Sequence, residues 1–187
     1  MTELDPRAEQ VLTFWFLELD SRRWFDSTAE TDAVIAERFA SLLAEASAAK
    51  LDSWSDSPRG LLALVIVLDQ FSRTIHRDEA GAFATDRQAQ ELVAKALERG
   101  DDAALTISER QFLYMPLMHA EDLELQKLGV AKFGELVSAA EDVVRFAEMH
   151  HDIVARFGRF PHRNAALDRA STGAERDYLA EHGNPFG

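Results

Sequence analysis

The stretch LLALVIVLDQFSR, Leu61 to Arg73, stands out from the rest of the sequence. It begins with eight consecutive apolar residues, 61–68, and turns polar at Asp69 and Gln70. Pro58 stands just upstream, and proline favours the first turn of a helix. A helix that is apolar all round is typical of a protein interior. The sequence therefore predicts a buried central helix with a polar end.

The polar end of this helix contains a carboxylate that needs a partner. An ionised carboxylate beside a dry core is costly unless it is paired, and Arg73 lies one helical turn after Asp69, at i+4. Asp69 and Arg73 could form a structural ion pair that fixes the helix. Alternatively, Asp69, Gln70 and Arg73 could form the floor of a polar pocket.

Helical patterns cover most of the remaining sequence, and no strand pattern or internal repeat interrupts them. Two consecutive helices are expected from His119 to about Val137 and from Glu141 to Phe157, the second with a shared apolar stripe. The stripe consists of Val143, Phe146, Ala147, His150, Val154 and Phe157. Capping-box patterns predict further helix starts at Ser27, Thr85, Thr106 and Thr172. We therefore expect one all-α domain over residues 1–187, with seven to nine helices in antiparallel pairs.

Composition limits the possible functions. The chain has 187 residues, a net charge of −13 and no cysteine. The charge argues against binding to nucleic acid or an anionic membrane, and the absence of cysteine rules out thiolate chemistry and disulfides. No apolar run is long enough to cross a bilayer, and the N-terminus lacks a secretory signal. We expect a cytoplasmic protein, and no cofactor or metal ligand set is assigned.

Two further groups of polar residues follow the central helix. The first accompanies the helix expected after Thr106 and consists of Glu109, Arg110, Tyr114, His119, Glu121 and Asp122. The second holds three arginines and lies between Ile153 and Leu167, where no acid occurs. It consists of Arg156, Arg159, His162, Arg163 and Asn164. Arginine forks suit carboxylate and phosphate groups. These arginines could therefore neutralise acids inside the fold, such as Asp69, Glu109, Glu121 or Asp122, or they could hold an anionic ligand in a cleft.

A His–Asp doublet at His151 and Asp152 offers a different chemistry. With His119 and a later Asp168 or Asp177, it is similar to the pattern of HD-type metal phosphohydrolases. Two adjacent residues are a weak signal, however. The known templates for nucleophile elbows, Walker A loops and zinc proteases are absent.

Several of these stretches together resemble the bacterial domain-of-unknown-function 924 family. They are LDQFSRTIHR, GAFATD, ERQFLYMPLMHAEDLELQ, FAEMHHDIVARFGRFPHRN and the RAST start of the last helix, and the resemblance begins near Val11. It implies a tetratricopeptide-like (TPR-like) α-α superhelix and no established activity. The resemblance places the family's polar signature on fourteen residues of this chain. They are Asp69, Gln70, Arg73, Glu109, Arg110, His119, Glu121, Asp122, His151, Arg156, Arg159, His162, Arg163 and Asn164. The chain departs from the family pattern at Ser72, where proline is usual, and at Asp168, where glycine is usual.

Three functional hypotheses remain from the sequence. In the first, the protein is a binding module in which Arg156, Arg159 and Arg163 clamp an anionic small molecule or peptide. Tyr114 and Phe160 would form its walls, and Asp69 and Glu121 would orient the arginines. In the second, it is a hydrolase of the metal-dependent phosphohydrolase kind, with His119 or His151 as general base near an acid. In the third, every charge is paired within the fold and the role is structural. A homodimer is possible in each case.

Overall fold

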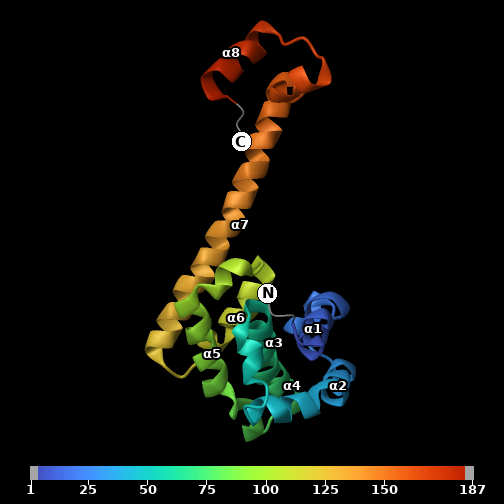
Figure 1. Ribbon diagram of the computed structural model, residues 1–187, viewed down its shortest axis with the longest axis vertical. Helices are drawn as coiled ribbons and strands as arrows, with labels where there is room; N and C mark the ends of the chain where they lie inside the picture. Colours follow the sequence, from blue (N-terminus) through green and yellow to red (C-terminus); the bar gives the residue numbers. More distant parts are fainter. Residues whose placement is uncertain (1–3, 184–187) are drawn as a thin grey trace. The chain divides into compact units, whose positions relative to one another are not determined.

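The computed structural model describes residues 4–183, with the side chains of all of them except Asp142, Val143 and Phe146. Over this range the chain forms eight α-helices and no strand, which confirms the predicted all-α fold with seven to nine helices (Figure 1). The α-helices are α1 Pro6–Thr13, α2 Ala29–Ser47, α3 Pro58–Val65, α4 Ser72–Ile75, α5 Asp86–Arg99, α6 Ile107–Met118, α7 Leu123–Phe157 and α8 Gly173–His182. Phe14–Glu18 and Ile66–Phe71 are π-helical, and the 3-10 turns are Ser21–Trp24, Asp52–Asp56, Ala80–Phe83, Asp101–Ala104, Pro161–Arg163 and Ala165–Leu167.

The chain divides into two compact units. The N-terminal unit ends at Leu136 and contains α1 to α6 with the start of α7, and the C-terminal unit begins at Val137 and contains the rest of α7 with α8. The single domain over residues 1–187, the antiparallel pairing and the TPR-like superhelix stay predictions. Within residues 4–183, no helix is both long and apolar enough to span a membrane.

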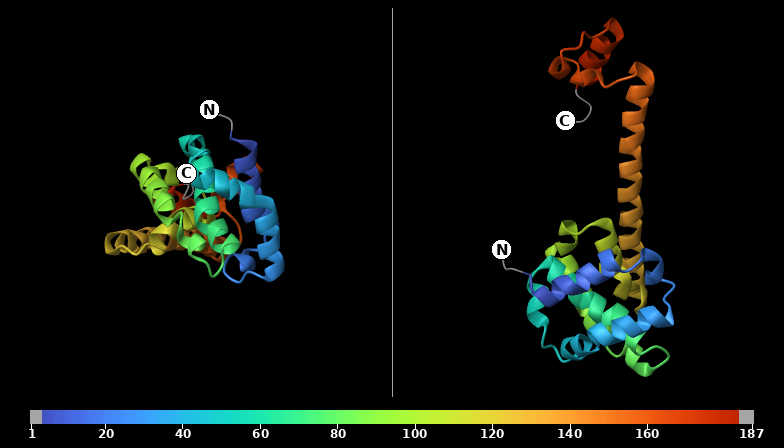
Figure 2. Two further views of the ribbon diagram at one scale, coloured as in Figure 1. Left: turned by 90° about the horizontal axis from the view of Figure 1, so that it is seen from below. Right: turned by 90° about the vertical axis from the view of Figure 1, so that its right-hand side faces the viewer.

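The predicted central helix is the core of the N-terminal unit. Pro58 occupies its first turn, and the Ser57 hydroxyl accepts a hydrogen bond from the Gly60 amide. Residues 61–68 are all buried. α3 packs against α1, α5 and α6, and the π-helical segment Ile66–Phe71 packs against α2, α5 and α6. Figures 1 and 2 show these helices from three directions. The apolar surface of this helix is therefore covered by neighbours on every side, as its sequence predicts.

Aromatic side chains fill the space between the central helix and the helices around it. The Phe71 ring stacks on the Phe39 ring, with 4.6 Å between the ring centroids. It also makes an edge contact with Trp15, with 5.6 Å between the centroids. Trp15 also contacts Phe112 edge to face, at 5.2 Å. Edge-to-face and stacked pairs of this kind stabilise a core beyond their buried area.

The predicted break before Glu141 is wrong, because α7 is one helix from Leu123 to Phe157. Residues 137–141, VSAAE, contain no glycine or proline, and alanine is the strongest helix former, so nothing in this segment ends a helix. In the predicted apolar stripe, the side chains of Val143 and Phe146 lie outside the described residues, and Ala147 and Val154 are exposed.

Two of the four predicted capping boxes are confirmed. Thr106 and Thr172 cap α6 and α8, each with reciprocal bonds to a glutamate three residues later. The other two predicted helix starts lie within one residue of the observed ones, but their capping boxes do not form. Thr28, rather than Ser27, caps α2, and the Thr85 hydroxyl donates to the Leu68 carbonyl at 2.5 Å instead of capping α5. The Ser27 hydroxyl donates to the nearby Asp32 side chain, whereas the Thr85 hydroxyl is used in a tertiary contact that a local sequence pattern does not register.

Candidate functional site

Asp69 lies in the π-helical segment that joins α3 to α4. π-helical turns inside α-helices are rare and often occur at functional sites. The Asp69 side chain is only 1% exposed, so its charge has to be satisfied by protein groups. The sequence places Asp69 directly after the eight apolar residues, and this position explains its burial.

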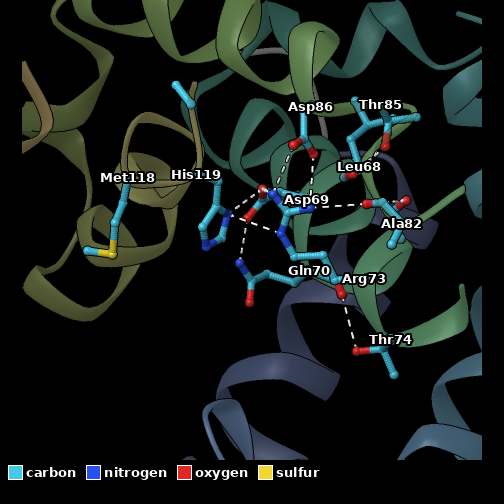
Figure 3. A network of polar contacts seen from close by, with 12 residues as sticks. Leu68, Asp69, Gln70, Arg73, Thr74, Ala82, Thr85, Asp86, Met118 and His119 are labelled. Atoms are coloured by element: carbon cyan, nitrogen blue, oxygen red, sulfur yellow. Dashed lines mark hydrogen bonds and ion pairs between the residues drawn. The ribbon is translucent and has the colours of Figure 1, made fainter. Parts of the chain in front are cut away.

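Three side chains satisfy the Asp69 carboxylate (Figure 3). Gln70 donates from Nε2 to Oδ2 at 2.5 Å, and the His119 Nδ1 atom lies 2.8 Å from Oδ1. Arg73 Nη2 lies 3.5 Å from Oδ1. The predicted i+4 pair between Asp69 and Arg73 is therefore present, but it is the longest of the three contacts.

The main partner of Arg73 is Asp86, at the start of α5. Arg73 donates to both carboxylate oxygens of Asp86, at 2.9 and 3.0 Å, and to the Ala82 carbonyl at 3.1 Å. Such bidentate pairs are strong and directional. We did not select Asp86 from the sequence. Asp86 is the last residue of the motif GAFATD, which is part of the family resemblance. That motif could have indicated Asp86, but the sequence pairs Arg73 more directly with Asp69.

The contacts of His119 fix the roles of its two ring nitrogens. Nδ1 lies near the Asp69 carboxylate at 2.8 Å and near Arg73 Nε at 3.2 Å. A carboxylate can only accept, whereas the Arg73 guanidinium can only donate, so the two contacts favour opposite tautomers of the neutral ring. The contact to Asp69 is the shorter of the two, and we therefore assign the ring proton to Nδ1. Nε2 then carries a lone pair, and among the described residues it has no hydrogen-bond partner. The ring can therefore accept a proton or a hydrogen bond at Nε2 while Asp69 holds it in place.

Arg73 and His119 lie between two pockets of the N-terminal unit. The larger pocket, of about 780 Å³, includes three acids, Asp86, Glu121 and Asp122, together with Arg87. The smaller pocket, of about 270 Å³, includes Arg23 and Arg77 and has no acid in its lining. We call the smaller one the arginine pocket. It is lined by Trp15, Arg23, Trp24, Phe25, Ser27, Ile35, Gln70, Arg73, Thr74, Arg77, Met115 and His119.

Five predicted site residues therefore line these two pockets, and a sixth, Asp69, lies behind them. Asp69 supports His119, while Arg73 and His119 line both pockets. Gln70 lines the arginine pocket, and Glu121 and Asp122 line the acid-containing pocket.

The other three predicted residues of the N-terminal unit have separate partners. Glu109 accepts a hydrogen bond from Arg59 at 2.7 Å and completes the cap of α6. Arg110 donates to backbone carbonyls, including that of Leu105 at 3.0 Å. The buried Tyr114 hydroxyl donates to Asp102 at 2.7 Å, and burial raises the Tyr114 pKa. These contacts fix the ends and the packing of α6.

In the C-terminal unit, the half-buried Arg159 forms an ion pair with the buried side chain of Glu175. Arg159 donates from Nε and Nη2 to the two Glu175 oxygens, at 2.6 and 2.8 Å. Asn164 donates to the same carboxylate at 3.3 Å. The Arg159 guanidinium lowers the pKa of Glu175 to about 2. We had expected Asp69, Glu109, Glu121 or Asp122 as internal partners, and the sequence showed Glu175 only as a helix cap.

Of the remaining predicted residues of the C-terminal unit, Arg156, Arg163 and His151 are exposed and His162 is half-buried. Arg156 lies over the Phe157 ring, at 4.9 Å, and Arg163 lies over Phe160, at 4.4 Å. Burial lowers the pKa of His162, with a further contribution from Arg163. His151 is exposed, and its Nδ1 lies 3.0 Å from Asp152. Among the described residues, no group of three or more His, Asp or Glu side chains is placed to hold a metal ion.

Comparisons with known proteins agree with the family resemblance. Residues 11–183 match the family model described as bacterial protein of unknown function (DUF924). A solved structure of a protein of unknown function, ATU0120 from Agrobacterium tumefaciens, is 36% identical to this chain. The alignment covers 94% of this chain and 97% of that one, with a TM-score of 0.62. No curated protein matches the chain. The chain thus belongs to the bacterial DUF924 family.

Proposed function

We propose that this protein is a binding module for an anionic small molecule or the carboxylate of a peptide, and that the ligand binds in the arginine pocket. The observation that carries the proposal is the composition of the lining, which has three arginines, one histidine and no acid. This composition contrasts with a net charge of −13 for the whole chain. A cleft lined by one sign of charge concentrates ligands of the opposite sign.

The proposal moves the expected anion site from one set of arginines to another. The sequence suggested Arg156, Arg159 and Arg163, but Arg159 is already committed to Glu175. Arg73 and Arg77 in the arginine pocket are also held by acids, Asp86 and Asp32. Those acids do not line the pocket, so they orient the guanidinium groups without occupying the ligand's place.

Two adjacent arginines provide a test with a matched control. Arg23 lines the arginine pocket, whereas Arg22 does not and its side chain is 86% exposed. The thermal stability of wild type, Arg23→Gln and Arg22→Gln would be measured against a panel of carboxylates and phosphates. At a ligand concentration of 100 Kd the native state gains about 2.7 kcal/mol, which raises the Tm by roughly 5–10 °C for a chain of this length.

The expected result is that an anion stabilises wild type and Arg22→Gln but stabilises Arg23→Gln much less. Equal stabilisation of all three proteins would place the anion elsewhere. If no anion stabilises wild type, binding at this pocket is refuted.

One observation favours hydrolysis as a second candidate function. His119 lines both pockets, and its contact with Asp69 leaves the lone pair on Nε2. A carboxylate–histidine pair of this kind can act as a general base. The test is release of product from carboxylate-bearing aryl esters and from phosphate monoesters, with and without divalent metal. Activity that is lost in His119→Gln but kept in His151→Gln would support this candidate. Activity that survives in His119→Gln would exclude the pair as its base.

A further inference from the structure

Arg23 is the least neutralised of the three arginines in the arginine pocket. Arg73 forms a bidentate pair with Asp86, and Arg77 donates twice to Asp32, at 3.1 and 3.0 Å. The acid nearest to Arg23 is Asp26, at 3.9 Å, and Arg23 Nη1 donates instead to the Asp26 backbone carbonyl at 3.2 Å. The Arg23 guanidinium therefore keeps most of its charge and donors available for a ligand.

Aromatic side chains form the wall beside Arg23. The indole nitrogen of Trp24 donates to the Trp15 carbonyl at 2.9 Å, which fixes Trp24 so that it offers its ring, rather than a donor, to the pocket. Phe25 is 67% exposed although it is a large apolar residue. It stacks on Phe112 at 6.4 Å and leaves much of its surface uncovered. A flat apolar group entering the pocket would cover this surface and remove it from water.

A buried donor without an acceptor also belongs to this pocket. Trp15 is 3% exposed, and its indole Nε1 has no hydrogen-bond partner among the described residues. Leaving a buried N–H group unpaired is unfavourable, and such groups in native proteins usually have an acceptor. Because Trp15 lines the arginine pocket, a ligand oxygen that reaches this nitrogen can serve as its acceptor.

We infer that the ligand of the arginine pocket is an aromatic carboxylate; this inference rests on the proposed function and narrows it to one chemical class. The carboxylate faces Arg23, since arginine forks match its two oxygens, and Trp15 Nε1 supplies a further donor. The ring lies against Trp24 and Phe25. A pocket of about 270 Å³ lies below the usual range for drug-sized ligands, so the ligand is small. The same chemistry is offered by a free aromatic acid and by a peptide that ends in phenylalanine.

The test is a titration of the full chain with phenylacetate, acetate, inorganic phosphate, phenylacetamide and N-acetyl-Gly-Phe. The indole N–H signals of the three tryptophans are followed by NMR, and Trp15→Phe assigns the signal of Trp15. We expect phenylacetate or the peptide to bind at least about tenfold more tightly than acetate, phosphate or the neutral amide, and to move the Trp15 signal. Arg23→Gln should weaken this binding about tenfold or more, as loss of a charge-assisted contact does, and Arg22→Gln by less than about twofold. The tighter of the two aromatic ligands identifies the source.

The outcomes separate this inference from the proposed function. If acetate or phosphate binds as tightly as phenylacetate and Arg23→Gln still weakens it, the pocket binds anions but the aromatic class is wrong. If phenylacetamide binds equally well, the carboxylate is not recognised and the inference is overturned. If no anion binds, or if Arg23→Gln binds like wild type, the proposed function fails together with the inference. A Trp15 signal that stays fixed while phenylacetate binds removes Trp15 from the site.

Discussion

Replacing the Asp69 carboxylate by an amide should change the chemistry of His119 while preserving the fold. In Asp69→Asn the new amide has the same shape but offers one acceptor and one donor. Gln70 can rotate its own amide, and His119 can move its ring proton, so both partners can adapt to a donor. Arg73 Nε, which lies 3.2 Å from His119 Nδ1, then meets a lone pair on Nδ1. The proton of the neutral ring should therefore move to Nε2.

The energetic cost of this change follows from the partners that remain. Arg73 keeps its bidentate contact with Asp86, so its charge stays paired, and a buried carboxylate no longer has to be desolvated. We expect Asp69→Asn to lower the free energy of unfolding by about 1.5–3 kcal/mol, the usual value of a hydrogen bond to a charged group. Asp69→Ala removes the acceptor completely and leaves a gap, so it should cost about 3–5 kcal/mol, as breaking a buried pair does.

Two measurements test this reasoning. Urea unfolding gives the free energies of the two variants, and ¹⁵N NMR of the neutral imidazole shows which nitrogen of His119 carries the proton. The expected result is an Nδ1–H ring in wild type and an Nε2–H ring in Asp69→Asn, with the alanine variant clearly less stable. A ring that keeps its proton on Nδ1 in Asp69→Asn, or equal destabilisation by both variants, would refute the assigned network.

Three further predictions concern stability, each measured by urea unfolding of the full chain. The folded-state pKa of Glu175 is about 2, below its ordinary 4.5, so its ion pair stabilises the protein fully above about pH 4.5. This contribution should be lost as the pH falls toward 2. Over that range, Glu175→Gln should lose less stability than wild type. Asp168 has a φ of +50°, so Asp168→Gly should stabilise by roughly 0.5–1 kcal/mol, and unchanged or lower stability would contradict the backbone argument. The Ser72 hydroxyl donates to the Gly81 and Ala82 carbonyls, so Ser72→Ala should cost about 1 kcal/mol, and no change would show that these bonds contribute nothing.

The fold could be predicted from the sequence wherever a structural feature depends on residues that are close together in the chain. The apolar run 61–68, Pro58 and the capping boxes at Thr106 and Thr172 each gave the correct structure because each depends on neighbours in the chain. Where a side chain had a distant alternative partner, as with Thr85 and Leu68, the local pattern was misleading.

The candidate site was only partly accessible for the same reason. Asp69, Arg73 and His119 could be selected by type and spacing, but the pairing of Arg73 with Asp86 and of Arg159 with Glu175 depends on tertiary contacts. Arg23 was not selected because nothing in its local sequence separates it from Arg22. The structure separates these two residues, because Arg23 lines the arginine pocket and Arg22 does not.

The central claim is that an anion binds in the arginine pocket, and a crystal structure with 4-bromobenzoate tests it most directly. The bromine atom can be located by its anomalous scattering, and the carboxylate is then placed from the density of the ring. We predict a bromine peak beside Trp24 and Phe25 with the carboxylate at Arg23. A peak near Arg156 or Arg163 instead, or no peak in crystals whose arginine pocket is open to solvent, would contradict the account.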